Sequence, residues 1–190
     1  DYLHRVQDQD LTLGIAMTDA KGDRSKRPHE QSNVDSYVHI VERNVRRNGR
    51  LGIVISGTKA IVTGAPYMHE LLVMPCRNMG QADTDFAVCC AVPIDAPGLE
   101  FVRNTGMAFE HPEHGAHAYL RFNDVELTND HLLGKAGEAF KIAQTRLGGG
   151  RVHHAMRSVG VLKKAMDMMC ERVLSRTTKG ERLADKQLTQ

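Results

Sequence analysis

The chain lacks several features that define large classes of proteins. No apolar run approaches the roughly 18 to 20 residues that span a bilayer, and no basic-then-apolar signal arrangement opens the chain. No basic block or aromatic-interleaved basic stripe is present, and 25 lysines and arginines nearly balance 23 acidic residues. We therefore expect a cytoplasmic protein with no membrane and no nucleic acid among its partners.

Cysteine is scarce, and its spacing fits no framework. The four cysteines (Cys76, Cys89, Cys90 and Cys170) form neither a CxxC pair nor a disulfide pattern. We expect them to be small buried hydrophobic residues in a reducing compartment. The adjacent Cys89 and Cys90 would point to opposite faces if their run is a strand.

Motifs for hydrolysis and metal binding are also missing. No GxSxG element and no phosphate-cradling glycine loop occur, which disfavours a hydrolase or a nucleotide triphosphatase. His111, His114 and His117 lie three apart, but Pro112 makes their stretch a loop that enters a strand. We expect solvated histidines there and no metal site.

What the first two thirds of the chain contain is a series of short β-prone runs. Residues 36–45 and 51–63 flank Arg47, Asn48 and Gly49, which predicts a hairpin. Further strands are expected over three runs, at residues 70–74, 84–94 and 116–125. Short strands without long helices between them predict an antiparallel sandwich or barrel.

After Asn129 the period becomes helical. Residues 136–147 predict a helix, three glycines (148–150) interrupt it, and apolar residues then recur at alternating three and four from Val152 to Val173. This stripe, about seven turns long, is typical of packing in a helical bundle. We predict an α+β fold with a β-rich domain over 1–125 and the first helices of a truncated helical domain over 126–190. The missing initial methionine and the helical composition of 181–190 suggest a fragment.

Two strand ends carry a threonine beside small residues. Thr18 lies in IAMTDAKGDRS, and Thr63 lies in KAIVTGA before Gly64, where the backbone can approach a ligand closely. Hydroxyl and backbone N–H groups are the donors that the polar edge of a flavin ring needs. From the residues alone, an ordinary turn is the more common explanation for Thr18. Arg151, after the three glycines, suits an anionic ligand or is a surface arginine at a flexible junction.

The C-terminal part of the chain resembles acyl-CoA dehydrogenases. The resemblance lies in EHPEHGAHAYLRFNDVELTNDHLLG, AFKIAQTRLGGGRVHHAMRSVG and MMCERVLSRTTKGERLADKQ. It implies a homodimer or homotetramer that holds FAD, dehydrogenates an acyl-CoA substrate between its α and β carbons, and delivers electrons to a transfer partner in fatty acid metabolism.

The same resemblance implies roles for four residues. Arg176, Gly180 and Gln187 would reach the FAD of a neighbouring subunit, with Lys179 where the family usually has an aromatic residue. Arg151 would lie on the acyl-CoA side.

The middle span, residues 17–102, instead resembles flavin-dependent 4-hydroxyphenylacetate hydroxylases and 4-hydroxybutyryl-CoA dehydratase. The matching segments are MTDAKGDRSKRPHEQ, GTKAIVTGAPYMHELLVMP and FAVCCAVPIDAPG. Under either branch the implied cofactor contacts are Met17, Thr18, Ile61 and Thr63, with Ile61 where acyl-CoA dehydrogenases usually have tryptophan.

Two departures bear on the reaction. Gly160 and Val161 stand seven residues after His153 and His154, where the dehydratase has a cysteine that ligates its iron–sulfur cluster. Gly150 stands where some dehydrogenases have the catalytic glutamate, so that base is expected beyond the last residue and the catalytic residue is unknown. Our leading interpretation is an FAD-dependent acyl-CoA dehydrogenase whose fragment is inactive by itself. The alternatives are a hydroxylase or dehydratase of the other branch, and a non-catalytic scaffold of the same fold.

Overall fold

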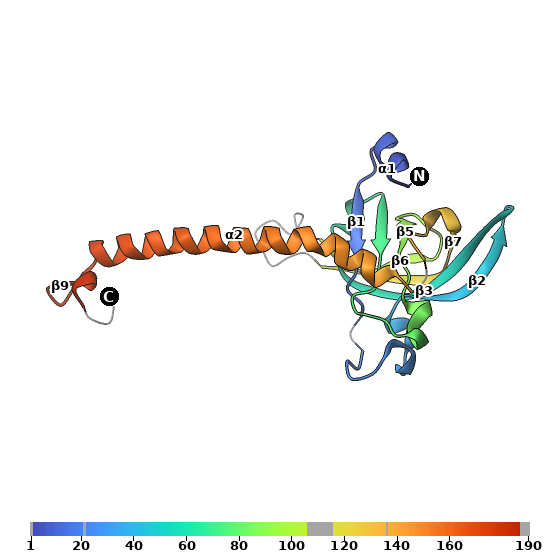
Figure 1. The fold of residues 1–190 in the computed structure, drawn as a ribbon, viewed down its shortest axis with the longest axis horizontal. Helices are drawn as coiled ribbons and strands as arrows, with labels where there is room; N and C mark the ends of the chain where they lie inside the picture. Colours follow the sequence, from blue (N-terminus) through green and yellow to red (C-terminus); the bar gives the residue numbers. More distant parts are fainter. Residues whose placement is uncertain (1, 21, 106–115, 136, 187–190) are drawn as a thin grey trace. The chain divides into compact units, whose positions relative to one another are not determined.

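The computed structural model describes residues 2–20, 22–105, 116–135 and 137–186 (Figure 1). Contacts between Cα atoms divide the chain into two compact units, Asp1–Gln144 and Thr145–Gln190, which are described separately. The helices are α1 (Tyr2–Asp8) and α2 (Ala139–Ser175). The strands are β1 (Leu13–Ala16), β2 (His39–Arg47), β3 (Arg50–Thr63), β4 (Glu70–Val73), β5 (Cys90–Pro93), β6 (Leu99–Thr105), β7 (His117–Thr128), β8 (Thr177–Thr178) and β9 (Glu181–Arg182).

The first unit contains a four-stranded antiparallel sheet in the order β2–β3–β7–β6. Its first two strands form the predicted hairpin, closed by Asn48 and Gly49 with φ of 48° and 79°. Two consecutive positive φ angles match the twist of a two-residue hairpin turn, and asparagine followed by glycine tolerates them. The hairpin prediction is confirmed.

A second, three-stranded sheet has the order β1–β4–β5, and here the antiparallel prediction was wrong in one pair. Strands β1 and β4 run parallel, whereas β4 and β5 run antiparallel. Parallel neighbours need a long crossover, and the chain between β1 and β4 makes the whole β2–β3 hairpin before it returns. Sequence periodicity does not reveal this return.

Buried side chains of both sheets form one core. Ile55 of β3, Leu71 of β4, Val92 of β5 and Leu120 of β7 are completely buried in the same cluster. In β7 buried and more exposed residues alternate over much of the strand, as its period-two pattern predicted. The two sheets therefore share one core, as the predicted sandwich or barrel requires.

The run 84–94, predicted as one strand, is a strand only from Cys90. Residues Gln81–Phe86 form a 3₁₀ turn. The buried carboxylate of Asp83 accepts hydrogen bonds from the backbone N–H of Gly80, which precedes this turn, and from the backbone N–H of His29, which is distant in the sequence. The bond from Gly80 satisfies a backbone donor locally, which favours a turn over a strand here.

The two adjacent cysteines enter different clusters. Cys90 belongs to the core between the sheets, whereas Cys89 packs with Met74, Ala139 and Ala143, so the first turns of α2 contribute to the first unit. The two side chains point into different clusters, although β5 begins only at Cys90, so the strand that the prediction assumed does not include Cys89. All four thiols are free, but Cys76 and Cys170 are exposed, so general burial of the cysteines was wrong.

Helix α1 has no counterpart among the predicted elements. Arg5 on α1 donates two hydrogen bonds, of 2.6 and 2.9 Å, to the carboxylate of Glu70 at the start of β4. The Tyr2 hydroxyl donates to the same carboxylate at 2.9 Å. Because this short helix is attached through polar side chains, its sequence has no periodic apolar pattern from which the helix could be predicted.

In the second unit, the predicted break at residues 148–150 was wrong, because α2 runs through all three glycines. Each helical glycine costs about 1 kcal/mol relative to alanine, a penalty that a long helix tolerates. The apolar stripe lies on the surface of this unit, where Val152 is 66 % exposed and Leu162 69 %. No helix in the described part of the chain is both long and apolar enough to cross a membrane.

Candidate functional site

The Thr18 segment, which follows β1, is tied directly to β3. The N–H of Ala60 donates to the carbonyl of Thr18 at 2.8 Å, and Asp19 and Lys59 form an isolated β-bridge. Thr63 is three residues beyond Ala60, which at a strand's rise of about 3.3 Å per residue is about 10 Å along β3. The two threonine-bearing segments are therefore adjacent, with the Thr18 hydroxyl group on an exposed residue.

A buried ion pair holds this junction. The Lys59 ammonium pairs with the Asp19 carboxylate, and it also donates to the carbonyls of Met17 at 3.0 Å and Met74 at 2.9 Å. Only 2 % of the Lys59 side chain and 5 % of the Asp19 side chain are exposed. Three acceptors satisfy the three ammonium protons, which is the condition for burying such a charge.

Strand β3 has an irregularity between the two threonine positions. Its register with β7 shifts between Lys59 and Val62, and Ile61 has a φ of 54° within the shift. A β-branched residue rarely adopts the left-handed region, and such strain clusters at functional sites. The Ile61 side chain is 61 % exposed, so this strain directs an apolar group outward from the sheet.

Thr63 lies at the end of β3 and is exposed. Its Oγ1 shares a hydrogen bond of 2.8 Å with His117 Nδ1 across the β3–β7 pair. The next residue, Gly64, has a φ of 73°, and its N–H donates to the carbonyl of Ala116. The glycine therefore lets the chain turn immediately after Thr63, and the bond to Ala116, the residue before β7, holds the turn.

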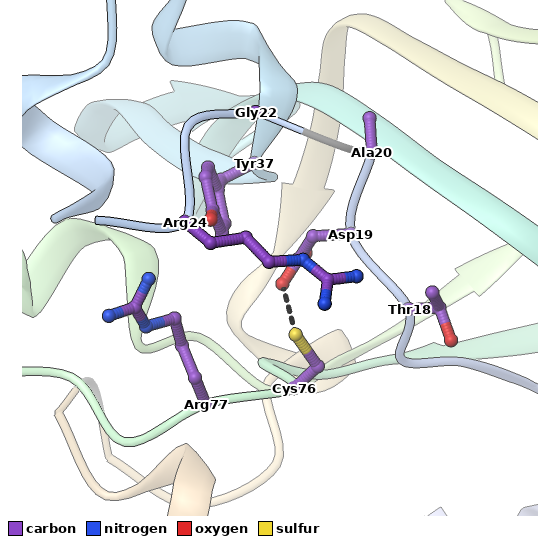
Figure 2. Close-up of a pocket in the computed structure, with 8 residues that line it drawn as sticks. All are labelled: Thr18, Asp19, Ala20, Gly22, Arg24, Tyr37, Cys76 and Arg77. Atoms are coloured by element: carbon purple, nitrogen blue, oxygen red, sulfur yellow. Dashed lines mark hydrogen bonds between the residues drawn. The ribbon is translucent and has the colours of Figure 1, made fainter. Parts of the chain in front are cut away.

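A pocket of about 330 Å³ opens beside Thr18 (Figure 2). It is lined by Thr18, Asp19, Ala20, Gly22, Arg24, Tyr37, Cys76 and Arg77. The Cys76 thiol donates to the second oxygen of Asp19 at 2.8 Å. Partial burial of the sulfur, together with the neighbouring Asp19 charge, raises the pKa of Cys76, so the pocket presents a neutral thiol at pH 7.

The remaining predicted residues lie in the second unit. Arg151 is on α2, and Arg176 is exposed just after the helix ends. Lys179 and Gly180 form the turn between β8 and β9, with φ of 54° and 84°. Gln187 lies outside the described residues, as do His111 and His114.

Several residues of the site were not singled out from the sequence. Lys59 had a signal, because a single charged residue inside an apolar strand is expected to have a buried partner. Its partner Asp19 and the pocket arginines Arg24 and Arg77 had none, since their proximity depends on how distant segments meet. His117 was considered only as a metal ligand.

Two family models match the chain. A model described as 4-hydroxyphenylacetate 3-hydroxylase N terminal matches residues 1–131. The chain belongs to this family. A second model, described as the C-terminal domain of acyl-CoA dehydrogenase, matches residues 137–190. The predicted resemblance of the chain to both groups is therefore confirmed. The first match ends and the second begins close to the end of the β-rich part.

Curated relatives of this family member come from both groups. The chain is 36 % identical to the protein named "Probable acyl-CoA dehydrogenase FadE2" of Mycobacterium tuberculosis, over 85 % of this chain and 40 % of the relative. It is 43 % identical to 4-hydroxybutyryl-CoA dehydratase/vinylacetyl-CoA-Δ-isomerase of Clostridium aminobutyricum, over 52 % of this chain and 19 % of the relative. The chain thus spans less than half the length of either relative.

Solved structures give the same picture of the fold. An acyl-CoA dehydrogenase from Geobacillus kaustophilus superposes with a TM-score of 0.65 at 19 % identity, over 99 % of this chain and 46 % of that one. The oxygenase component of 4-hydroxyphenylacetate 3-monooxygenase, complexed with FAD, superposes with a TM-score of 0.58 at 24 % identity, over 74 % and 31 %. At these identities the likeness concerns the fold, and the chain is part of that larger fold.

Proposed function

We propose that the chain belongs to an FAD-dependent acyl-CoA dehydrogenase that dehydrogenates an acyl-CoA thioester between its α and β carbons. The observation that supports this most directly is the bond between Ala60 N–H and the Thr18 carbonyl, which joins the two threonine-bearing segments. A relative that matches 85 % of the chain is named a probable acyl-CoA dehydrogenase, and the family model that matches residues 137–190 describes the C-terminal domain of acyl-CoA dehydrogenase.

The side chains at the junction fit the chemistry of a flavin. A flavin has an apolar ring face and a polar edge with carbonyl and nitrogen acceptors. Exposed Ile61 offers an apolar surface, and Thr18 and Thr63 are exposed residues whose hydroxyls can donate hydrogen bonds. The half-buried side chain of Met17 can add to the apolar surface for the ring, while its carbonyl accepts a hydrogen bond from Lys59.

Within this proposal each residue has a binding or orienting role. Bound FAD would supply the redox chemistry, as the acceptor of a hydride from the substrate β-carbon. Thr18 would hold the pyrimidine edge and Thr63 the region of the hydride-accepting nitrogen, while Ile61 excludes water from the ring face. His117 orients the Thr63 hydroxyl through their shared hydrogen bond.

The second unit contributes through the resemblance alone. Arg176, Gly180 and Gln187 would contact the FAD of a neighbouring subunit in a homodimer or homotetramer, and Arg151 would serve the acyl-CoA substrate. An electron-transfer partner, a cytoplasmic location and a role in fatty acid metabolism belong to the same proposal.

The visible spectrum of the full-length protein tests the flavin part. We expect a yellow protein with flavin absorption that bleaches when an acyl-CoA is added without oxygen. Thr63→Ala should weaken FAD binding about tenfold, which corresponds to one lost hydrogen bond of about 1.4 kcal/mol, whereas Thr63→Ser should retain it. A colourless protein that takes up no added FAD would refute the proposal.

A second candidate is a flavin-dependent hydroxylase or dehydratase, which the family match over residues 1–131 and the 43 % identity to the dehydratase favour. Supplying reduced flavin, oxygen and a phenol to the full-length protein separates the two. Hydroxylated phenol would favour the second candidate. Conversion of 4-hydroxybutyryl-CoA without an electron acceptor would favour the dehydratase, and acyl-CoA-dependent bleaching alone favours the dehydrogenase.

A further inference from the structure

The pocket beside Thr18 contains one carboxylate, and that carboxylate is already neutralised. Asp19 pairs with buried Lys59 on one oxygen and accepts from the Cys76 thiol on the other. Each of its two oxygens therefore already has a partner. The remaining charged groups of the pocket wall are the guanidinium groups of Arg24 and Arg77.

These two guanidinium groups keep donors available. Within the described part of the chain, neither is paired with a carboxylate, and Arg77 uses one N–H to bind the carbonyl of Lys26 at 3.2 Å. Nearby, the carboxylate of Asp83 is bound by Arg27 and His29, and Asp23, which accepts from Ser25, is not among the residues that line the pocket. Because Asp19 is paired with Lys59, the charged groups of the pocket wall have a net positive charge.

The loop that presents Arg24 is held in place. The buried side chain of Gln31 accepts from the N–H of Asp23 at 3.0 Å and donates to its carbonyl at 2.7 Å. A Cβ at Gly22 would lie 2.6 Å from the Gln31 side-chain oxygen, so glycine permits this close packing. The two residues that precede Arg24 are thus fixed, and Figure 2 shows the arginine side chain extending across the pocket toward Thr18.

We propose that this pocket binds the phosphate or diphosphate group of the ligand whose ring or chain lies against Thr18. Two guanidinium groups match phosphate oxygens through paired, charge-assisted hydrogen bonds. The volume of about 330 Å³ is within the range of small-molecule sites, and Tyr37 is among the residues that line it. The identity of the ligand rests on the proposed function, which offers two sources of a diphosphate: FAD and coenzyme A.

Inorganic pyrophosphate tests the pocket independently of any flavin. Binding to the full-length protein is measured by titration calorimetry, together with the variants Arg24→Gln and Arg77→Gln. We expect the Kd for pyrophosphate to rise about tenfold in each variant, since a charge-assisted hydrogen bond contributes about 1.5 kcal/mol or more. Arg50→Gln is the control, because Arg50 is an exposed arginine outside the pocket, and it should leave the Kd unchanged.

Matched ligands then identify the source. If the diphosphate belongs to FAD, both pocket variants weaken FAD while riboflavin, which has no phosphate, keeps its Kd. If it belongs to coenzyme A, the variants weaken coenzyme A but leave pantetheine and FAD unchanged. Either result supports the proposal and distinguishes the two sources.

The proposal is overturned if pyrophosphate, FAD and coenzyme A all bind the two pocket variants as they bind the unmodified protein. It is also overturned if riboflavin weakens as much as FAD, because the arginines would then act on the ring site. In both cases the flavin spectrum of the unmodified protein still decides the proposed function separately. A protein that binds pyrophosphate through Arg24 but takes up no flavin would retain the pocket and refute the flavin assignment.

Discussion

Lys59 of β3 and Asp19 of the segment after β1 form an ion pair that is buried at both ends. The pair lies beside the bond from Ala60 to Thr18, so it joins the two segments that carry the proposed flavin contacts. In addition to this pairing, the Lys59 ammonium donates to the carbonyls of Met17 and Met74, and the Asp19 carboxylate accepts from the Cys76 thiol.

Lys59→Met should lower the free energy of unfolding by about 3–5 kcal/mol, because it leaves the Asp19 carboxylate buried without its cation. Urea unfolding followed by circular dichroism measures this loss. The double variant Lys59→Met/Asp19→Leu should recover a large part of it, since an apolar pair needs no compensation. A loss below about 1 kcal/mol in the single variant would show that the carboxylate finds water instead.

Ile61→Gly should raise the free energy of unfolding by about 1 kcal/mol relative to Ile61→Ala. Both changes remove an exposed side chain, but only glycine adopts the φ of 54° without steric cost. Comparing the two variants by chemical denaturation isolates the backbone term. Equal stabilities would mean that the strand relaxes when the isoleucine is removed. Both variants should bind FAD more weakly if the side chain covers the ring.

Cys76 should alkylate with a midpoint above pH 9, because partial burial and the Asp19 charge raise the pKa of its thiol above the ordinary value of 9.0. Mass spectrometry of iodoacetamide-treated protein over a pH series measures it, with the exposed Cys170 as internal reference. Asp19→Asn should move the midpoint to lower pH, since it removes the negative charge beside the sulfur. A midpoint at or below pH 9 in the unmodified protein would contradict the prediction.

Asp83 should make stability depend on pH in the acid range. Burial by itself would raise the pKa of Asp83, but hydrogen bonds from His29 and Gly80 and the charge of Arg27 lower it below the ordinary value of 3.8. A carboxyl whose folded pKa is depressed stabilises fully above its ordinary pKa, and this stabilisation is lost as the pH falls through the folded value.

The variant Asp83→Asn checks that dependence. It should be less stable than the unmodified protein at pH 7, and the gap should shrink at pH 3, as urea unfolding at both values would show. Asp130→Asn removes an exposed carboxylate and should show no such gap. A gap for Asp83→Asn that is constant with pH would mean that packing, and not charge, accounts for its effect.

The sequence by itself determined the elements whose signal is local. The hairpin at Asn48 and Gly49, the alternation in β7 and the separate destinations of Cys89 and Cys90 follow from turn chemistry and side-chain periodicity. The family resemblance was likewise readable from contiguous motifs. Thr18 and Thr63 were candidates for the same reason, although their roles stay proposals.

Only the tertiary structure decided what depends on the return of distant segments. The parallel pairing of β1 with β4, the Lys59–Asp19 pair and the presence of Arg24 and Arg77 in one pocket wall each bring together residues more than 35 positions apart, and no periodicity encodes such a meeting. The three glycines in α2 show that a local signal can also mislead. Each lowers the stability of the helix by about 1 kcal/mol relative to alanine, but the helix continues through them. Local propensity therefore predicts which segments form, whereas burial of charges and apolar faces decides which segments meet.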